Sequence, residues 1–116
     1  MSKILVLDDN RGICHLLEEI FSMDGHEVKA YSEIDSIDID FEKFKPDIGI
    51  FDINMNSDML KIVKKLKKLH PEMKKIFMSA DEPDNKYKGY PFISKPFDIL
   101  KLKQFVYDII KEKLVV

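Results

Sequence analysis

The chain has 116 residues, of which 45% are hydrophobic and 34% are charged, a balance typical of one globular domain. It contains a single cysteine, Cys14, which excludes an internal disulfide and argues against a cysteine-based zinc site. The sequence shows no signal peptide and no apolar stretch long enough to span a membrane, so we expect a cytoplasmic protein.

The net charge of −2 conceals an asymmetry along the chain. Residues 1–58 contain 5 basic and 14 acidic side chains, a balance of −9, whereas residues 59–116 contain 14 basic and 7 acidic side chains, a balance of +7. Such asymmetry can mark a nucleic-acid-binding surface, but it more often reflects solvated faces that attract one another within one fold. We favour the second interpretation and do not expect direct nucleic-acid binding.

The first elements alternate between strand and helix. Residues 4–7 are an apolar run typical of a strand buried on both faces. A helix is predicted next, with Asn10 as its N-cap and Gly25 as its stop. The apolar residues that recur there at helical spacing are Ile13, Leu16, Leu17, Ile20 and Phe21. Residues 28–31 predict a second strand.

A second helix is predicted before the third strand. Its apolar face would be formed by Ile34, Ile37, Phe41 and Phe44. Pro46 then breaks the chain, and the segment DIGIFDI predicts a third strand that ends near Asp52.

The second half continues the alternation. A third helix is predicted with Leu60, Val63, Leu66 and Leu69 facing inward and five lysines on its other face. Strands are predicted at 75–80 and 91–94, and a last helix runs close to the C-terminus. Its predicted inward residues are Ile99, Leu102, Phe105, Val106, Ile109 and Ile110. This order predicts an α/β fold, an open parallel sheet with right-handed crossovers and helices on both faces.

Polar side chains follow four of the predicted strands. Asp8 and Asp9 follow the first strand, Asp52 ends the third, Ser79 ends the fourth and Lys95 follows the fifth. Taken singly, each has a simpler explanation: the acids could cap a helix or turn, Ser79 could be satisfied locally, and Lys95 could be a surface lysine. In parallel α/β sheets, however, ligands bind at the carboxyl ends of the strands, where these groups would meet.

Three converging carboxylates repel one another and favour a bound cation. Mg²⁺ suits such a site because it takes oxygen ligands and keeps several waters. An aspartate can also act as a nucleophile and accept a phosphoryl group as an acyl phosphate. The charge that spreads over the phosphoryl oxygens then needs a cation and hydrogen-bond donors, which Lys95 and Ser79 would supply.

Four motifs resemble the receiver (CheY-like) domain of two-component response regulators, in the family's order and over essentially all of residues 1–116: VLDDN, DIGIFDINM, FMSA and FISKPF. The resemblance implies a flavodoxin-like, doubly wound sheet of five parallel strands in the order 2-1-3-4-5. It also implies a phosphoacceptor signalling domain that takes a phosphoryl group from a sensor histidine kinase or a phosphotransfer protein. Phosphorylation would switch binding to a downstream partner, and the domain would catalyse its own dephosphorylation rather than act as a conventional enzyme.

The resemblance assigns the phosphoacceptor role to Asp52. Asp9 and Asp52 would be direct Mg²⁺ ligands, and Asp8 would act mainly through water. The backbone carbonyl of Asn54 would complete the ligands that the protein contributes.

The resemblance also assigns roles on the last two strands. Ser79 would contact the phosphoryl group, and Lys95 would be the family's lysine, followed by a cis peptide at Pro96. Phe92 matches the aromatic position whose ring moves inward when Ser79 is drawn to the phosphoryl group. Phe92 could equally be a plain core residue.

Two stretches depart from the family's pattern. The segment after Asp52 reads Met55-Asn56, without the usual Met-Pro pair and with no glycine before Gly89, so we expect a different loop there. Only residues 81–90 connect the fourth and fifth strands, and a crossover with its helix needs at least ~10–12 residues.

Because Pro83 and Gly89 also disfavour a helix, we predict that the fourth crossover helix is shortened or absent. In this family the fourth helix forms part of the usual dimerisation and signalling surface, so the oligomeric state stays open. An alternative function, a phosphate-independent receiver-like interaction module, stays open as well. No effector module follows residue 116 in this sequence, so we expect either output through a protein partner or a phosphorelay step, or that residues 1–116 are a piece of a longer protein.

Overall fold

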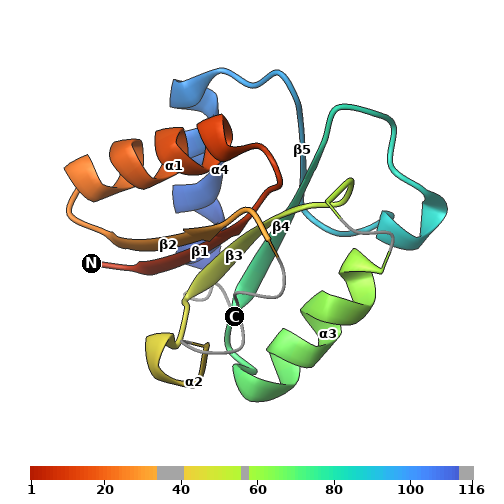
Figure 1. Cartoon of the computed structure of the whole chain (residues 1–116), viewed down its shortest axis with the longest axis horizontal. Coiled ribbons are helices and arrows are strands. Elements are labelled where there is room, and N and C mark those ends of the chain that lie inside the picture. The colour runs from red at the N-terminus through yellow and green to blue at the C-terminus, as the bar shows by residue number, and fades with distance from the viewer. Residues whose placement is uncertain (34–40, 56–57, 113–116) are drawn as a thin grey trace.

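The computed structural model describes residues 1–33, 41–55 and 58–112 and contains one parallel sheet with the strand order β2-β1-β3-β4-β5 (Figure 1). The strands are β1 (Lys3–Leu7), β2 (Glu27–Tyr31), β3 (Ile48–Asp52), β4 (Lys74–Ser79) and β5 (Phe92–Ser94). The helices are α1 (Arg11–Met23), α2 (Phe41–Phe44), α3 (Met59–Leu69) and α4 (Ile99–Lys111), with a 3-10 turn, η2, at Asn85–Tyr87. The predicted strand order is therefore confirmed.

The sheet is covered on both faces. Alternate residues of the central strands point to opposite sides: Ile4 and Val6 of β1 pack with α1 and α4, whereas Leu5 and Leu7 pack with α3. All five residues of β3 are buried. Strands buried on both faces read as continuous apolar runs, which explains why these segments were recognisable from sequence.

The register aligns the carboxyl ends of the central strands. Leu7 of β1 pairs with Phe51 of β3, and Asp52 pairs with Met78 of β4. The next residue after β1 and the last residues of β3 and β4 therefore reach the same edge of the sheet. This edge carries the site described below.

The first helix confirms its predicted ends. The side chain of Asn10 accepts a hydrogen bond from the backbone N–H of Ile13 (3.2 Å), as an N-cap does. Beyond the helix, Gly25 has a φ of +87°, the left-handed conformation that glycine adopts at low cost. The predicted second helix is described only at Phe41–Phe44, since residues 34–40 lie outside the described residues, as do residues 56–57 of the loop after β3.

Two residues predicted to face inward are exposed. Leu69 is 56% exposed because it is the last residue of α3, one position before the His70 cap. Ile99 is 39% exposed because it is the first residue of α4, directly after the N-cap Asp98. In both cases the helical spacing is correct, but the side chain lies at a helix end where less of the core remains to cover it.

The connection between β4 and β5 confirms the predicted loss of the crossover helix. It contains one 3-10 turn, η2, at the far right of Figure 1. Tyr87 of this turn is only 4% exposed, and its ring meets Phe77 of β4 edge-on with centroids 4.9 Å apart. The ring of Tyr90 also contacts Phe77 edge-on at 5.4 Å. Two tyrosines thus cover a part of β4 that a crossover helix would otherwise cover.

None of the helices in the described part of the chain is long and apolar enough to cross a membrane.

Candidate functional site

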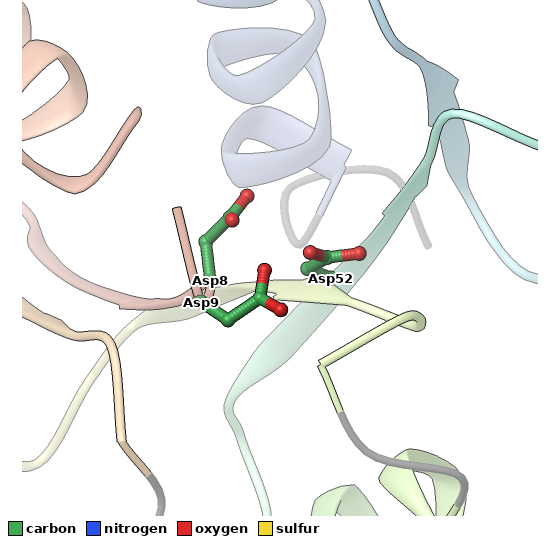
Figure 2. A group of neighbouring side chains, drawn as sticks. All are labelled: Asp8, Asp9 and Asp52. Carbon is green, nitrogen blue, oxygen red and sulfur yellow. The ribbon is translucent and has the colours of Figure 1, made fainter. Parts of the chain in front are cut away.

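Three aspartates meet at the carboxyl edge of the sheet. Asp8 follows β1 and is fully buried, Asp52 ends β3 and is 2% exposed, and Asp9 is exposed. Figure 2 shows the three side chains gathered at the ends of these two neighbouring strands. One oxygen from each carboxylate lies within 4.8 Å of the other two, so the predicted convergence of the acids is confirmed.

Lys95 brings a positive charge into this acidic group. Its Nζ lies 2.7 Å from Asp8 Oδ2 and 3.3 Å from Asp52 Oδ2. The backbone N–H of Lys95 donates to the carbonyl of Ser79 (2.8 Å), which ties the end of β5 to the end of β4. The Lys95–Pro96 peptide is cis, as the resemblance implied.

Burial and charge shift the acid–base properties of this group. Burial raises the pKa of Asp8, and the neighbouring Asp52 raises it further, while Lys95 and the backbone N–H of Asn10 act in the opposite direction. Burial alone would lower the pKa of Lys95, but its contacts with Asp8 and Asp52 outweigh burial and raise it. Lys95 is therefore held in its charged form, although one cation does not balance three carboxylates.

The carboxylate oxygens of Asp8 and Asp52 differ in the hydrogen bonds and ion pairs that they make. Asp8 Oδ1 accepts from the backbone N–H of Asn10, and Asp52 Oδ1 accepts from the backbone N–H of Asn54, both at 2.9 Å. Asp8 Oδ2 is buried and has no hydrogen bond among the described residues; its contact with Lys95 is an ion pair. The three carboxylates together form a set of hard oxygen donors that fits Mg²⁺.

Ser79 faces the same edge and is fully buried. Its hydroxyl oxygen accepts a hydrogen bond from the side-chain amide of Asn54 and another from the backbone N–H of Asp81, both at 3.0 Å. Sequence reasoning did not predict this contact of the Asn54 side chain with Ser79. The available signal was the spacing, because Asn54 and Asp81 each lie two residues beyond a site residue.

Phe92 lies apart from the carboxylates, at the start of β5. It is half-buried and packs against the core cluster that contains Phe77 and Tyr87. An aromatic ring at this position is compatible with both of the roles considered above.

A doubly wound parallel sheet with three aspartates, a serine and a lysine at its carboxyl edge defines the receiver class of signalling domains. The family model for the response regulator receiver domain matches residues 4–107. The chain therefore belongs to the response regulator receiver domain family of two-component systems.

Known proteins resemble the chain over nearly its whole length. One is the Sporulation initiation phosphotransferase F of Bacillus subtilis (strain 168), 29% identical over 112 residues that cover 90% of each chain. A solved receiver domain protein (CheY-like) from Methanospirillum hungatei JF-1 has a TM-score of 0.85 at 22% identity and covers 97% of this chain and 96% of its own. Another, from Clostridium thermocellum, has a TM-score of 0.79 at 26% identity with full coverage of both chains.

Proposed function

We propose that this chain is a phosphoacceptor domain in which Asp52 receives a phosphoryl group from a phosphohistidine on a sensor histidine kinase or a phosphotransfer protein. The observation that carries the proposal is the Lys95 ammonium, which contacts both Asp8 and Asp52 at the edge where Ser79 is buried. We further propose that the protein acts in the cytoplasm.

The acidic group would hold Mg²⁺ in this proposal. Asp9 and Asp52 would bind it through their carboxylates, Asp8 mainly through water, and Asn54 through its backbone carbonyl. When bound, Mg²⁺ offsets the repulsion among the carboxylates and the negative charge of the phosphoryl oxygens. The support is the donor set itself, three carboxylates with oxygens that lie within 4.8 Å of one another.

The residues of the chain then account for the transfer step. A carboxylate oxygen of Asp52 attacks phosphorus, and the new P–O bond forms as the P–N bond of the phosphohistidine breaks. The imidazole leaves with the bonding electron pair and takes up a proton from water. The hydrogen bond from the Asn54 N–H fixes the orientation of the Asp52 carboxylate, and Lys95 offers its charge to the transferred oxygens.

The same site would produce the conformational switch. The Ser79 hydroxyl, which now accepts two hydrogen bonds, would turn to donate one to a phosphoryl oxygen. Phe92 would then move inward and change the surface offered to a downstream protein. Attack of water on the acyl phosphate would return Asp52 to its carboxylate form without a separate phosphatase.

Intact mass spectrometry tests the proposal. The wild-type protein, incubated with Mg²⁺ and phosphoramidate, should gain one phosphoryl group. Asp52→Asn should gain none, and neither should the wild type in excess chelator. Asp47→Asn is the matched control, because Asp47 is an exposed acid just before the opposite end of β3, and this variant should react like the wild type.

The short crossover favours a second candidate function, the phosphate-independent interaction module. The connection between β4 and β5 contains one 3-10 turn in place of a crossover helix, and this changes a surface of the domain. A wild-type chain that gains no adduct, under conditions that modify a known receiver, would favour this candidate over phosphotransfer.

A further inference from the structure

The outer face of α3 carries a concentration of positive charge. Five of its eleven residues are lysines and none is acidic. Four of these lysines are exposed, and at 3.6 residues per turn they fall on one arc about 100° wide. They are Lys61, Lys64, Lys65 and Lys68.

No ion pair of these four lysines is found among the described residues. They are also neighbours of one another, since Lys61 and Lys65 stand four residues apart, as do Lys64 and Lys68. Like charges at this spacing destabilise a helix. Lys68, in the last turn, is favoured by the helix dipole, but helix stability does not explain the lysines at positions 61, 64 and 65.

The basic surface continues past the C-terminal end of α3. Residues 59–75 hold seven lysines and only one acidic residue, Glu72. Lys67, Lys74 and Lys75 line a shallow cavity of about 180 Å³, which Glu112 also lines. Lys67 donates to the carbonyl of Met73 (2.5 Å), and burial together with the nearby Lys75 and Lys74 lowers its pKa. At this end of the surface, Lys67 is thus close enough to Lys74 and Lys75 to be repelled by them.

The residue types favour a protein carboxylate surface over nucleic acid. Bidentate recognition of nucleic-acid bases uses the planar fork of arginine and the amides of Asn and Gln, and α3 contains none of these residues. Lysines are mobile point charges that suit an array of carboxylates. Acidic side chains on a helix repeat about every 5–6 Å at i, i+4, which matches the spacing of the lysines.

We propose that the outer face of α3, with Lys61, Lys64, Lys65 and Lys68, is a docking surface for an acidic protein partner. The surface is separate from the phosphoacceptor site, because it lies along the helix and not at the carboxyl edge of the sheet (Figure 1). The proposal does not depend on whether Asp52 is phosphorylated.

Fluorescence anisotropy with a labelled oligo-glutamate peptide at low salt tests this surface. The test variant is K61Q/K64Q/K65Q/K68Q. The matched control replaces four exposed lysines outside α3, as K43Q/K88Q/K101Q/K111Q, and changes the net charge equally. We expect the α3 variant to bind about tenfold more weakly than the wild type, because several exposed ion pairs are lost together, and the control to bind nearly as well as the wild type.

Three results would overturn the proposal. The first is that the wild type fails to bind the peptide at low salt. The second is equal weakening in the two quadruple variants, which would mean that net charge alone decides binding. The third is that a duplex DNA of matched charge binds more tightly than the peptide and loses its binding in the α3 variant, which would assign the surface to nucleic acid.

Discussion

The side-chain amide of Asn54 donates a 3.0 Å hydrogen bond to the hydroxyl of Ser79. This bond joins the loop after β3 to the end of β4, directly beside Asp52. In the proposed switch the Ser79 hydroxyl turns toward a phosphoryl oxygen, so the bond to Asn54 must be weakened or broken. Asn54 therefore holds Ser79 in the conformation of the unphosphorylated domain.

Removing this restraint should favour the phosphorylated conformation. A hydrogen bond of this kind contributes about 0.5–1.5 kcal/mol, so Asn54→Ala should bind the phosphoryl mimic beryllofluoride about 2- to 12-fold more tightly in the presence of Mg²⁺. Titration calorimetry measures this affinity. In a Ser79→Ala background the same substitution should change nothing. Weaker binding by Asn54→Ala would instead mean that the amide contacts the phosphoryl group itself.

Lys95 stabilises the buried carboxylates of Asp8 and Asp52 through ion pairs. Lys95→Met leaves two buried carboxylates without their positive partner and should lower the free energy of unfolding by about 3 kcal/mol, the lower end of the cost of breaking a buried ion pair. Urea unfolding at neutral pH in chelator measures this loss. Lys101→Met is the control, because Lys101 is an exposed lysine of α4. Equal losses in the two variants would contradict the role given to Lys95.

The raised pKa of Asp8 determines the direction in which the stability of the folded protein changes with pH. Because burial raises it in the folded state, the folded protein holds this proton more tightly than the unfolded chain does. The contribution of Asp8 to stability is therefore complete below its ordinary pKa of 3.8 and is lost as the pH rises through the raised value. In chelator, Asp8→Asn should gain stability relative to the wild type as the pH rises, measured by urea unfolding from about pH 4 to about pH 7. A constant difference between the two proteins would contradict this account.

Mg²⁺ should restore the stability that the folded protein loses when its buried carboxylates ionise. A ligand present at 100 times its dissociation constant stabilises the folded state by about 2.7 kcal/mol. The wild type should therefore gain stability from Mg²⁺ at neutral pH and less in acid, where protons compete for the carboxylates. Thermal unfolding with and without Mg²⁺ measures the gain. Asp52→Asn and Asp9→Asn should gain much less, and an unchanged gain in both would exclude these acids as the ligands.

Tyr87 replaces packing that a crossover helix would otherwise supply. Tyr87→Ala should lower the free energy of unfolding by about 3–5 kcal/mol, the range for truncating a buried aromatic side chain. Tyr87→Phe should cost much less, because it removes only the hydroxyl and keeps the buried ring. Urea unfolding measures both. If Tyr87→Ala costs less than Tyr90→Ala, which truncates a half-buried ring, the assignment of Tyr87 as the main packing residue is wrong.

The central sheet and the acidic edge could be predicted from sequence for a physical reason. The segment from Ile48 to Asp52 is buried throughout, so its apolar run is continuous and the acid at its end stands out. Parallel strands end at a common edge, which brings Asp8, Ser79 and Lys95 to Asp52 without any knowledge of loop geometry. The loss of the crossover helix between β4 and β5 could be predicted from the length of residues 81–90 and from Pro83 and Gly89.

Other features depended on spatial detail that the pattern of residues does not contain. Helical spacing places Leu69 and Ile99 on the inward arc, but only the structure shows that each lies at a helix end. That Tyr87 fills the space of the lost helix depends on how the connection folds back over Phe77. The bond from Asn54 to Ser79 depends on the shape of two loops.

The identity of the phosphorylated residue is the most direct test of the account. The wild-type protein would be phosphorylated with Mg²⁺ and phosphoramidate and then reduced with borohydride, which converts an acyl phosphate on aspartate to homoserine. Peptide mass mapping would locate the homoserine. The account predicts homoserine at position 52 and at no other position. Homoserine at position 8 or 9, or phosphate that resists reduction because it is bound to a serine or histidine, would contradict it.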